Sequence, residues 1–135
     1  MTSLQTRLRV RYAETDQMGV VYYANYLVWM EVGRAEYCRS IGFEYREMER
    51  ADGIFLAVVD AHCRYLSPAR YDDEIVVATS ILKANRRMVA FRYEIAAQGG
   101  RAVANGETTH VFLGPDFKPV KLPPKYYAHF GVTGR

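Results

Sequence analysis

The chain has 135 residues, of which 50% are hydrophobic and 24% are charged, and its formal net charge at pH 7 is +3. This length is enough for a core that needs neither disulfides nor a metal, so residues 1–135 are expected to form a single domain. The small net charge does not indicate nucleic-acid binding, and no stretch has the roughly 20 apolar residues of a membrane span. Because no N-terminal run resembles a signal peptide either, we expect a cytoplasmic protein.

The first part of the chain predicts one strand followed by one long helix. From Leu4 to Tyr12, apolar residues alternate with arginines, which is typical of a half-buried strand with Tyr12 on its apolar face. The following loop runs to Asn25, a good N-cap residue, and Gly42 is well placed to end the helix. This helix, of about 16 residues, carries one apolar stripe. The stripe consists of Tyr26, Trp29, Met30, Gly33, Tyr37 and Ile41.

The second part predicts four strands joined largely by hairpins. After a stretch without clear periodicity from Phe43 to Gly53, the apolar period switches to two. Apolar residues from Val59 to Tyr65 alternate with polar ones, and Pro68 ends that strand. Gly99-Gly100 predicts a hairpin, and the proline-rich tail is expected to be extended until a turn near Tyr126. The strands span Ala57 to Leu66, Glu74 to Leu82, Met88 to Ala97, and Ala102 to Leu113. One helix burying its stripe against one antiparallel sheet makes an α+β two-layer domain.

The cysteines and histidines do not indicate a metal site. Cys38 and Cys63 are not spaced like a metal knuckle, and we expect both to be buried free thiols. His62, His110 and His129 have no close metal-binding spacing. The sequence also lacks a Gly-x-Ser-x-Gly elbow and a Walker loop. We therefore predict neither a metal nor a bound cofactor.

Asp16 is the candidate catalytic acid. It lies in a glycine-containing loop shortly before the predicted helix start at Asn25. A carboxylate there can meet a substrate carbonyl held by the unpaired backbone N–H groups of the helix end. The alternative is structural: a lone Asp beside a glycine more often caps its own turn, here Gln17-Met18-Gly19.

Three segments, in this order and spacing, carry a resemblance to a known family: Tyr12 to Tyr26, Leu27 to Glu31, and Tyr65 to Ile75. They resemble the hotdog-fold acyl-CoA thioesterases of the 4-hydroxybenzoyl-CoA thioesterase family, in its bacterial YbgC-like branch. The resemblance implies an α+β hotdog fold, in which a curved antiparallel sheet of about five strands wraps a long central helix. It also implies hydrolysis of a small aromatic or short- to medium-chain acyl-CoA to the free acid and coenzyme A. Family members pair their open sheet edges, which implies a homo-oligomer, either a dimer or a tetramer.

The resemblance assigns roles to residues around the helix start. It makes Asp16 the catalytic carboxylate, acting either as a nucleophile or as a general base, and Tyr23 the residue whose backbone N–H polarises the thioester. Apart from the resemblance, the N–H groups around Tyr23, Ala24 and Asn25 lie at or just before the predicted helix start, where the helix dipole adds to their pull on a carbonyl oxygen. Asn25 is therefore a further candidate for substrate binding. Glu14 matches no acid that the family requires. Several bacterial relatives carry His at the position of Tyr23, and a tyrosine there favours an aromatic or branched acyl group.

Glu31 lies about two turns into the helix, at the edge of its apolar stripe. One interpretation is that it selects a hydroxyl group of the substrate near the acyl end of the site. The other is a surface ion pair with Arg34 at i+3, which would contribute only a few tenths of a kcal/mol.

The resemblance places a basic cluster, Lys83, Arg86 and Arg87, at the phosphates of coenzyme A, with Arg64 as a weaker candidate. The alternative is a solvated hairpin end. A phosphopantetheine arm would suit the same cluster, so acyl-carrier-protein thioesters are a second possible substrate class.

Two other functions remain open. The domain can bind acyl-CoA without hydrolysing it, because fold alone does not confer activity. Acyl transfer or dehydration ranks third, since related dehydratases use a histidine and the segment from Asp16 to Tyr26 has none.

Overall fold

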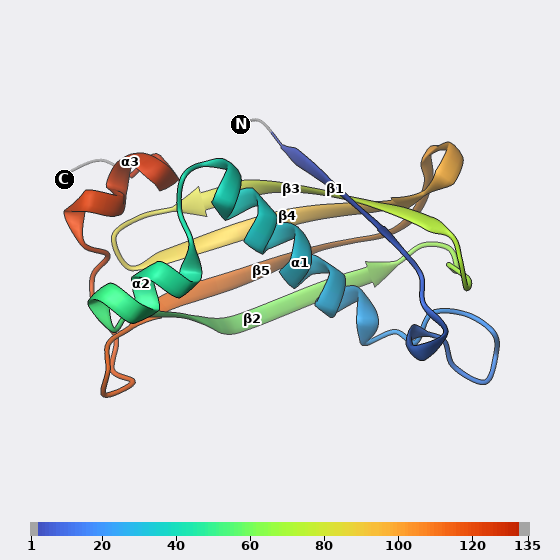
Figure 1. The fold of residues 1–135 in the computed structure, drawn as a ribbon, viewed down its shortest axis with the longest axis horizontal. Helices are drawn as coiled ribbons and strands as arrows, with labels where there is room; N and C mark the ends of the chain where they lie inside the picture. Colours follow the sequence, from blue (N-terminus) through green and yellow to red (C-terminus); the bar gives the residue numbers. More distant parts are fainter. Residues whose placement is uncertain (1–2, 133–135) are drawn as a thin grey trace.

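The computed structural model describes residues 3–132, which form one five-stranded antiparallel sheet and three α-helices (Figure 1). The strand order is β1-β3-β4-β5-β2, so β1 and β2 are the two edges. Short 3₁₀ turns lie at Tyr12–Glu14, Gln98–Gly100 and Pro124–Tyr126. In chain order, the other elements are β1 (Leu4–Arg9), α1 (Asn25–Ser40), α2 (Tyr45–Asp52), β2 (Phe55–Tyr65), β3 (Glu74–Ala84), β4 (Met88–Ala97), β5 (Arg101–Leu113) and α3 (Tyr127–Phe130).

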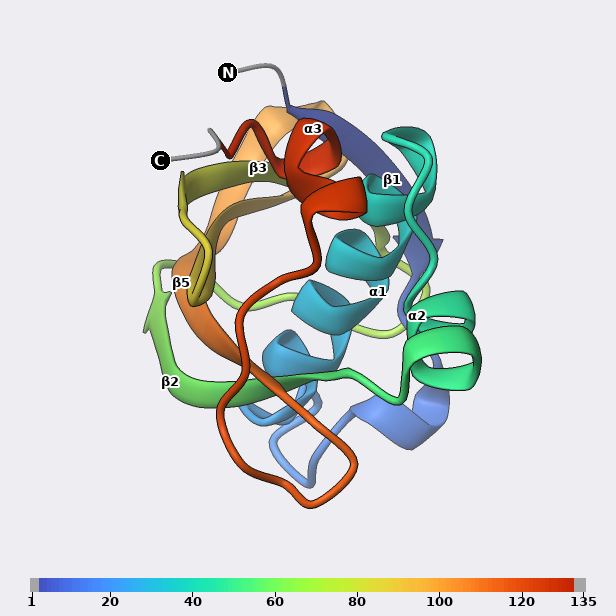
Figure 2. The same ribbon diagram turned by 90° about the vertical axis from the view of Figure 1, so that its left-hand side faces the viewer.

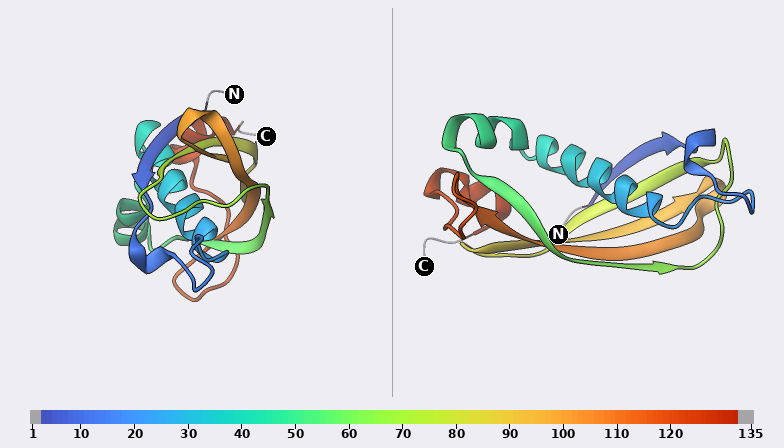
Figure 3. Two further views of the ribbon diagram at one scale, coloured as in Figure 1. Left: turned by 90° about the vertical axis from the view of Figure 1, so that its right-hand side faces the viewer. Right: turned by 90° about the horizontal axis from the view of Figure 1, so that it is seen from below.

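The sheet curves around α1, which lies along its concave face (Figure 2). Helices α1, α2 and α3 are all on this side, and the opposite face of the sheet carries none of the described helices (Figure 3). The predicted α+β arrangement of one long helix wrapped by a curved antiparallel sheet is therefore confirmed.

Close packing between α1 and the sheet depends on a glycine. A Cβ atom added at Gly33 would lie 2.5 Å from Oγ1 of Thr79 on β3. The predicted stripe is buried, apart from Ile41, which is half-buried. The stripe is wider than expected, because Arg34 is also buried, at 8% exposure.

The 16-residue length predicted for the helix is confirmed, but its predicted N-cap is wrong. Ala24 occupies the N-cap position and Asn25 is the first helical residue, whose side chain bonds elsewhere. Tyr12 was also misplaced on a buried strand face, since β1 ends at Arg9. The chain turns away into the 3₁₀ segment there, which leaves Tyr12 72% exposed and stacked on Tyr71.

The four later strands lie within two residues of their predicted bounds, and the stretch without clear periodicity contains α2. The half-buried alternation predicted for β2 is wrong for most of its length. From Val58 to His62 its side chains are exposed on both faces, because α1 packs chiefly against β1 and β3 and leaves this part of β2 uncovered. Strand β2 is also an edge strand with a bulge between Val58 and Asp60. The 3₁₀ turn at Gln98–Gly100 and the turn at Tyr126 lie where they were predicted.

Both cysteines are free, as predicted; Cys38 is buried and Cys63 is half-buried. Burial raises the pKa of the Cys38 thiol to about 11. Among the described residues, no helix has the length and apolarity to cross a membrane.

Candidate active site

A cavity of about 560 Å³ lies where the β1–α1 loop, the start of α1 and the end of β2 meet. Its volume is within the range of small-molecule sites. The lining is mostly apolar and aromatic, and Asp16 is its only carboxylate within the described chain. The lining residues are Asp16, Met18, Val20, Val21, Tyr22, Tyr23, Tyr26, Tyr65, Leu66, Ser67 and Pro68.

Asp16 both caps its own turn and faces the cavity. Its Oδ1 accepts a hydrogen bond from the Met18 N–H at 2.9 Å, and its carbonyl accepts one from Gly19, which has φ +80°. Asp16 therefore does cap its own turn, as the structural interpretation of this residue predicted. Within residues 3–132, Oδ2 receives no hydrogen bond, so one carboxylate oxygen is available to a substrate or a water.

Glu14 anchors the same loop from the protein interior. It is 5% exposed, and its carboxylate accepts hydrogen bonds from the Arg11 N–H and from Trp29 Nε1, both at 2.8 Å. Burial alone would raise the pKa of the Glu14 carboxyl, but these hydrogen bonds outweigh burial and lower it. Glu14 faces Trp29 and does not line the cavity, which suits a structural role.

Of the two backbone N–H groups just before α1, that of Tyr23 belongs to a cavity-lining residue and that of Ala24 does not. The Asn25 N–H is used, since it donates to Tyr22 O at 2.9 Å, and the Asn25 side chain donates to Glu14 O at 2.8 Å. Asn25 thus holds the loop and does not line the cavity. Within the described residues, the N–H groups of Tyr23 and Ala24 donate no hydrogen bond. They precede the positive end of the helix dipole, where a carbonyl oxygen gaining charge is stabilised.

Tyr26 and Tyr65 are wall residues that sequence reasoning did not single out. Their rings are 5.3 Å apart in an edge-to-face arrangement, and the Tyr65 hydroxyl donates to the Tyr23 carbonyl at 3.0 Å. Tyr26 was assigned to the core stripe, and it is indeed 3% exposed. The signal that could have marked Tyr65 is its place at the end of a strand, directly before the Leu66-Ser67-Pro68 segment.

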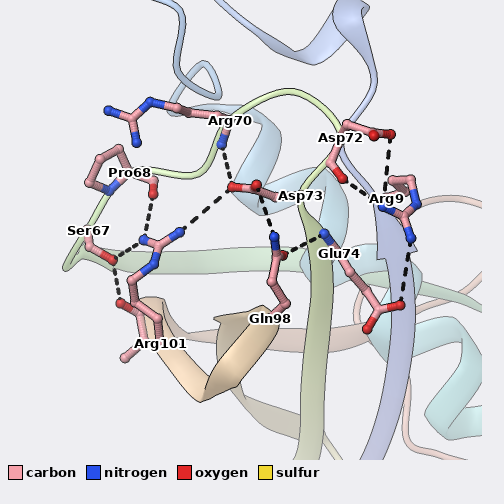
Figure 4. A network of polar contacts seen from close by, with 10 residues as sticks. Arg9, Ser67, Pro68, Arg70, Asp72, Asp73, Glu74, Gln98 and Arg101 are labelled. Carbon is pink, nitrogen blue, oxygen red and sulfur yellow. Dashed lines mark hydrogen bonds and ion pairs between the residues drawn. The ribbon is translucent and has the colours of Figure 1, made fainter.

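That segment forms one wall of the cavity, and a polar network holds it (Figure 4). Arg101 donates to Ser67 Oγ at 2.8 Å and to the Pro68 carbonyl at 2.7 Å. Ser67 donates in turn to the Ala102 carbonyl, while Asp73 accepts from the Arg70 N–H at 2.9 Å and lies 3.7 Å from Arg101. The wall is thereby fixed to the start of β5.

Glu31 does not line this cavity. It borders a separate hollow of about 400 Å³ between α1 and α2, together with Tyr45. The alternative of a surface pair with Arg34 is wrong, because Arg34 points into the core and donates to the Tyr93 hydroxyl at 3.0 Å.

The basic cluster is also distant from Asp16 within one protomer. Arg86 and Arg87 border a hollow of about 390 Å³ with Asn85 and Lys121. Lys83 is the second-last residue of β3, just before this hollow. Strand β3 begins at Glu74, near the cavity, and runs about 35 Å to this hairpin (Figure 1). Arg64 is exposed on β2. The structure therefore brings together Asp16 and Tyr23, but neither Glu31 nor the basic cluster.

Comparisons with known proteins agree with the resemblance seen in the sequence. The Bacillus subtilis protein YneP, whose name assigns it provisionally to the acyl-CoA thioesterases, is 41% identical over 116 residues, covering 85% of this chain and 83% of YneP. The Escherichia coli acyl-CoA thioester hydrolase YbgC is 30% identical, covering 91% and 92%. The crystal structure of a DHNA-CoA thioesterase from Staphylococcus aureus superposes with a TM-score of 0.93 at 34% identity, covering 97% and 90%.

A family model described as the thioesterase superfamily matches residues 18–104, which include the end of the β1–α1 loop, both α1 and α2, and strands β2, β3 and β4; Asp16 lies just before the matched residues. With this match and the relatives above, the chain belongs to the thioesterase superfamily, has the hotdog fold and is a thioester hydrolase.

Proposed function

We propose that this protein hydrolyses acyl-CoA thioesters in the cavity that contains Asp16. The observation that supports it most directly is that Asp16 and Tyr23 line the same cavity. In the described part of the chain, one Asp16 carboxylate oxygen accepts no hydrogen bond and the Tyr23 N–H donates none. The names of the relatives YneP and YbgC, both referring to acyl-CoA, point to the same substrate class.

In the proposed reaction, the thioester oxygen accepts from the N–H of Tyr23 as negative charge develops on it. Asp16 then acts in one of two ways. It attacks the acyl carbon and forms an anhydride that water opens, or it takes a proton from a water that attacks the same carbon. In both routes the carbon–sulfur bond breaks, and coenzyme A leaves as a thiol after protonation. These groups suffice for the chemistry, so we propose that neither a metal nor a bound cofactor takes part.

We propose a small aromatic or a short- to medium-chain acyl group as the substrate. Tyr22, Tyr23, Tyr26 and Tyr65 contribute rings to the cavity, and such surfaces bind flat or short apolar groups well.

We further propose that the protein works in the cytoplasm as a homo-oligomer, either a dimer or a tetramer. The exposed edge strand β2 carries Val58 and Val59, which are 53% and 58% exposed, and pairing with a second copy would cover them. The basic cluster lies at the far end of the sheet from Asp16. If it binds the phosphates of a substrate held by Asp16, a second protomer must supply it.

The test is thiol release from a panel of benzoyl-, phenylacetyl-, butanoyl-, hexanoyl- and decanoyl-CoA. We expect rapid turnover of one class by the wild type and a loss of about 100-fold or more in kcat for Asp16→Asn. The matched control is Asp116→Asn, because the Asp116 carboxylate accepts from the N–H two residues later, Lys118, as Asp16 does from Met18. A control as impaired as Asp16→Asn would contradict the assignment of Asp16.

The alternatives give different results in the same assay. Hydrolysis of acyl-carrier-protein thioesters but of no acyl-CoA would assign the second substrate class. Tight binding of acyl-CoA without turnover of either would support a binding module, and would overturn the proposed activity.

A further inference from the structure

Asn25, the first residue of α1, makes two hydrogen bonds that the proposed reaction does not use. Its backbone N–H donates to the Tyr22 carbonyl oxygen at 2.9 Å, which closes a turn from Tyr22 to Asn25. Its side-chain Nδ2 donates to the Glu14 carbonyl oxygen at 2.8 Å. Tyr23, whose N–H is the proposed donor to the thioester oxygen, lies inside this turn.

The Glu14 carbonyl oxygen holds both ends of the turn. It accepts a hydrogen bond from the Tyr22 N–H at 2.8 Å as well as the one from the Asn25 side chain. A carbonyl oxygen has two lone pairs, so it can accept both bonds at once. The turn is therefore attached through the backbone at its first residue and through a side chain at its last.

The turn determines the direction of the Tyr23 N–H. The Tyr22 carbonyl and the Tyr23 N–H belong to one planar trans peptide group, in which they point in opposite directions. Because the Tyr22 oxygen points to the Asn25 N–H, the Tyr23 N–H points the other way, beyond the start of α1. Tyr23 lines the cavity, and within residues 3–132 its N–H donates no hydrogen bond.

The same attachment point is close to the catalytic acid along the chain. Glu14 precedes Asp16 by two residues. The buried Glu14 carboxylate accepts from Trp29 Nε1 at 2.8 Å, so Glu14 is itself held in the interior. Its carbonyl oxygen therefore connects the loop that carries Asp16 to the turn that carries Tyr23.

We propose that Asn25 is a positioning residue for the thioesterase reaction, whose side chain holds the turn so that the Tyr23 N–H meets the oxygen of a thioester bound beside Asp16. The inference rests on the proposed function, because it concerns the same substrate and the same donor. It gives Asn25 a role that acts through the backbone, in place of the direct substrate contact expected from the sequence.

The experiment compares Asn25→Ala with a matched control, Ser40→Ala, at the other end of α1. Ser40 is the last residue of the helix, and its hydroxyl also donates to a backbone carbonyl, that of Tyr37, at 2.6 Å. Each variant thus loses one side-chain hydrogen bond to a backbone oxygen. Only the bond from Asn25 attaches the turn that contains Tyr23.

The two variants should differ in kcat. The substrate is whichever acyl-CoA of the panel the wild type hydrolyses fastest. We expect Asn25→Ala to lower kcat about 10-fold with KM changed less than about twofold, because a misaligned donor weakens the transition state more than the bound substrate. Ser40→Ala should stay within about twofold of the wild type in both constants.

A second readout separates positioning from a general loss of structure. A ketone analogue of the same acyl-CoA, with a methylene group in place of the thioester sulfur, cannot be hydrolysed. Its carbonyl carbon is labelled with carbon-13, and the carbonyl stretch of the bound analogue is recorded by infrared difference spectroscopy. A hydrogen bond to the oxygen lowers this frequency, so the stretch should move to higher frequency in Asn25→Ala and stay the same in Ser40→Ala.

If Asn25→Ala does not fold, Asn25→Ser takes its place in both measurements. Serine is favoured at the start of a helix, and its side chain is too short to reach the Glu14 carbonyl in the same way.

The outcomes distinguish this inference from the proposed function. A loss of kcat together with the frequency shift supports it. Unchanged kcat in the Asn25 variant, or an altered kcat or KM at unchanged carbonyl frequency, would overturn it while leaving the hydrolase intact. A wild type that hydrolyses no acyl thioester would instead contradict the proposed function, and with it this role for Asn25.

Discussion

Arg34 of α1 and His110 of β5 lie at the two ends of one buried chain of hydrogen bonds. Arg34 donates to the Tyr93 hydroxyl at 3.0 Å, the Tyr93 and Thr108 oxygens are 2.6 Å apart, and Thr108 Oγ1 lies 2.8 Å from His110 Nε2. Because a guanidinium can only donate, each hydroxyl can pass its own hydrogen onward, and the chain ends on Nε2 as an acceptor. That arrangement requires a neutral imidazole.

Acid should therefore destabilise the protein through His110. Burial, and then repulsion from Arg34, lowers the pKa of His110 to about 3. The unfolded chain, with a histidine pKa of about 6.5, binds one more proton than the folded protein between these values. The stability that comes from neutral His110 is complete above about pH 6.5 and is lost as the pH falls toward 3.

We expect the lowered pKa of His110 to reduce the free energy of unfolding of the wild type by about 2 kcal/mol as the pH falls from 7 to 5. His110→Gln can still accept from Thr108 but does not titrate, so its stability should fall less over this range. Urea unfolding at pH 7, 6 and 5 measures the difference. Parallel pH curves for the two proteins would show that His110 is protonated in the folded state.

Replacement of Glu14 by Gln should loosen the loop that carries Asp16. The Glu14 carboxylate accepts from the Arg11 N–H and from Trp29 Nε1 through different oxygens, whereas an amide offers one acceptor oxygen and leaves one donor unpaired. We expect a loss of about 1–3 kcal/mol in urea unfolding and a lower kcat/KM.

The control for Glu14→Gln is Glu36→Gln. Glu36 forms an exposed pair with Arg39 on the surface of α1, and its loss should cost no more than about 0.5 kcal/mol. Equal costs in the two variants would mean that the buried contacts of Glu14 contribute nothing beyond a surface ion pair.

Arg101→Met should weaken substrate binding more than catalysis. The change keeps most of the apolar stem but removes the hydrogen bonds to Ser67 and Pro68 that hold one wall of the cavity (Figure 4). We expect KM to rise about 3- to 10-fold, with kcat within about twofold. Arg92→Met, which removes an exposed pair with Glu107 on the other sheet face, should change neither constant. A fall in kcat at unchanged KM would place Arg101 in a different role.

Local signals in the sequence predicted most of the fold. The helix ends where Gly42 takes φ +85°, and the turn before β5 lies at Gly99-Gly100, because both depend on nearby residues alone. The failures have tertiary causes. Arg34 is polar but buried, since Tyr93 reaches it from strand β4. Part of β2 is exposed on both faces, since α1 packs chiefly against β1 and β3.

Contacts between distant parts of the chain also limited what the sequence predicted about the site. The family pattern placed Asp16 and Tyr23, whose geometry comes from one continuous loop and helix start. It did not single out Tyr65 or Arg101, because each acts on the site from a strand distant in sequence. The separation of the basic cluster from Asp16 follows from the length of β3, and no local pattern records it.

The basic cluster provides the last prediction. We expect Lys83→Gln/Arg87→Gln to raise the KM for acyl-CoA about 10-fold, because contacts to the phosphates of coenzyme A are lost. The KM for the same acyl group on pantetheine, which lacks those phosphates, should stay the same. Arg46→Gln, which removes a positive charge beside the Glu31 hollow, is the control for overall charge.

Because β3 separates the cluster from Asp16 within a protomer, the effect should cross between copies of the chain. Mixed oligomers of Asp16→Asn and Lys83→Gln/Arg87→Gln protomers then contain sites in which an intact Asp16 meets an intact basic cluster from its neighbour. Those sites should recover the wild-type KM, at a fraction of wild-type kcat set by the mixing ratio. If every active site in the mixture kept the raised KM, a neighbouring protomer would not be supplying the basic cluster. That result would contradict the prediction that the cluster acts between copies of the chain.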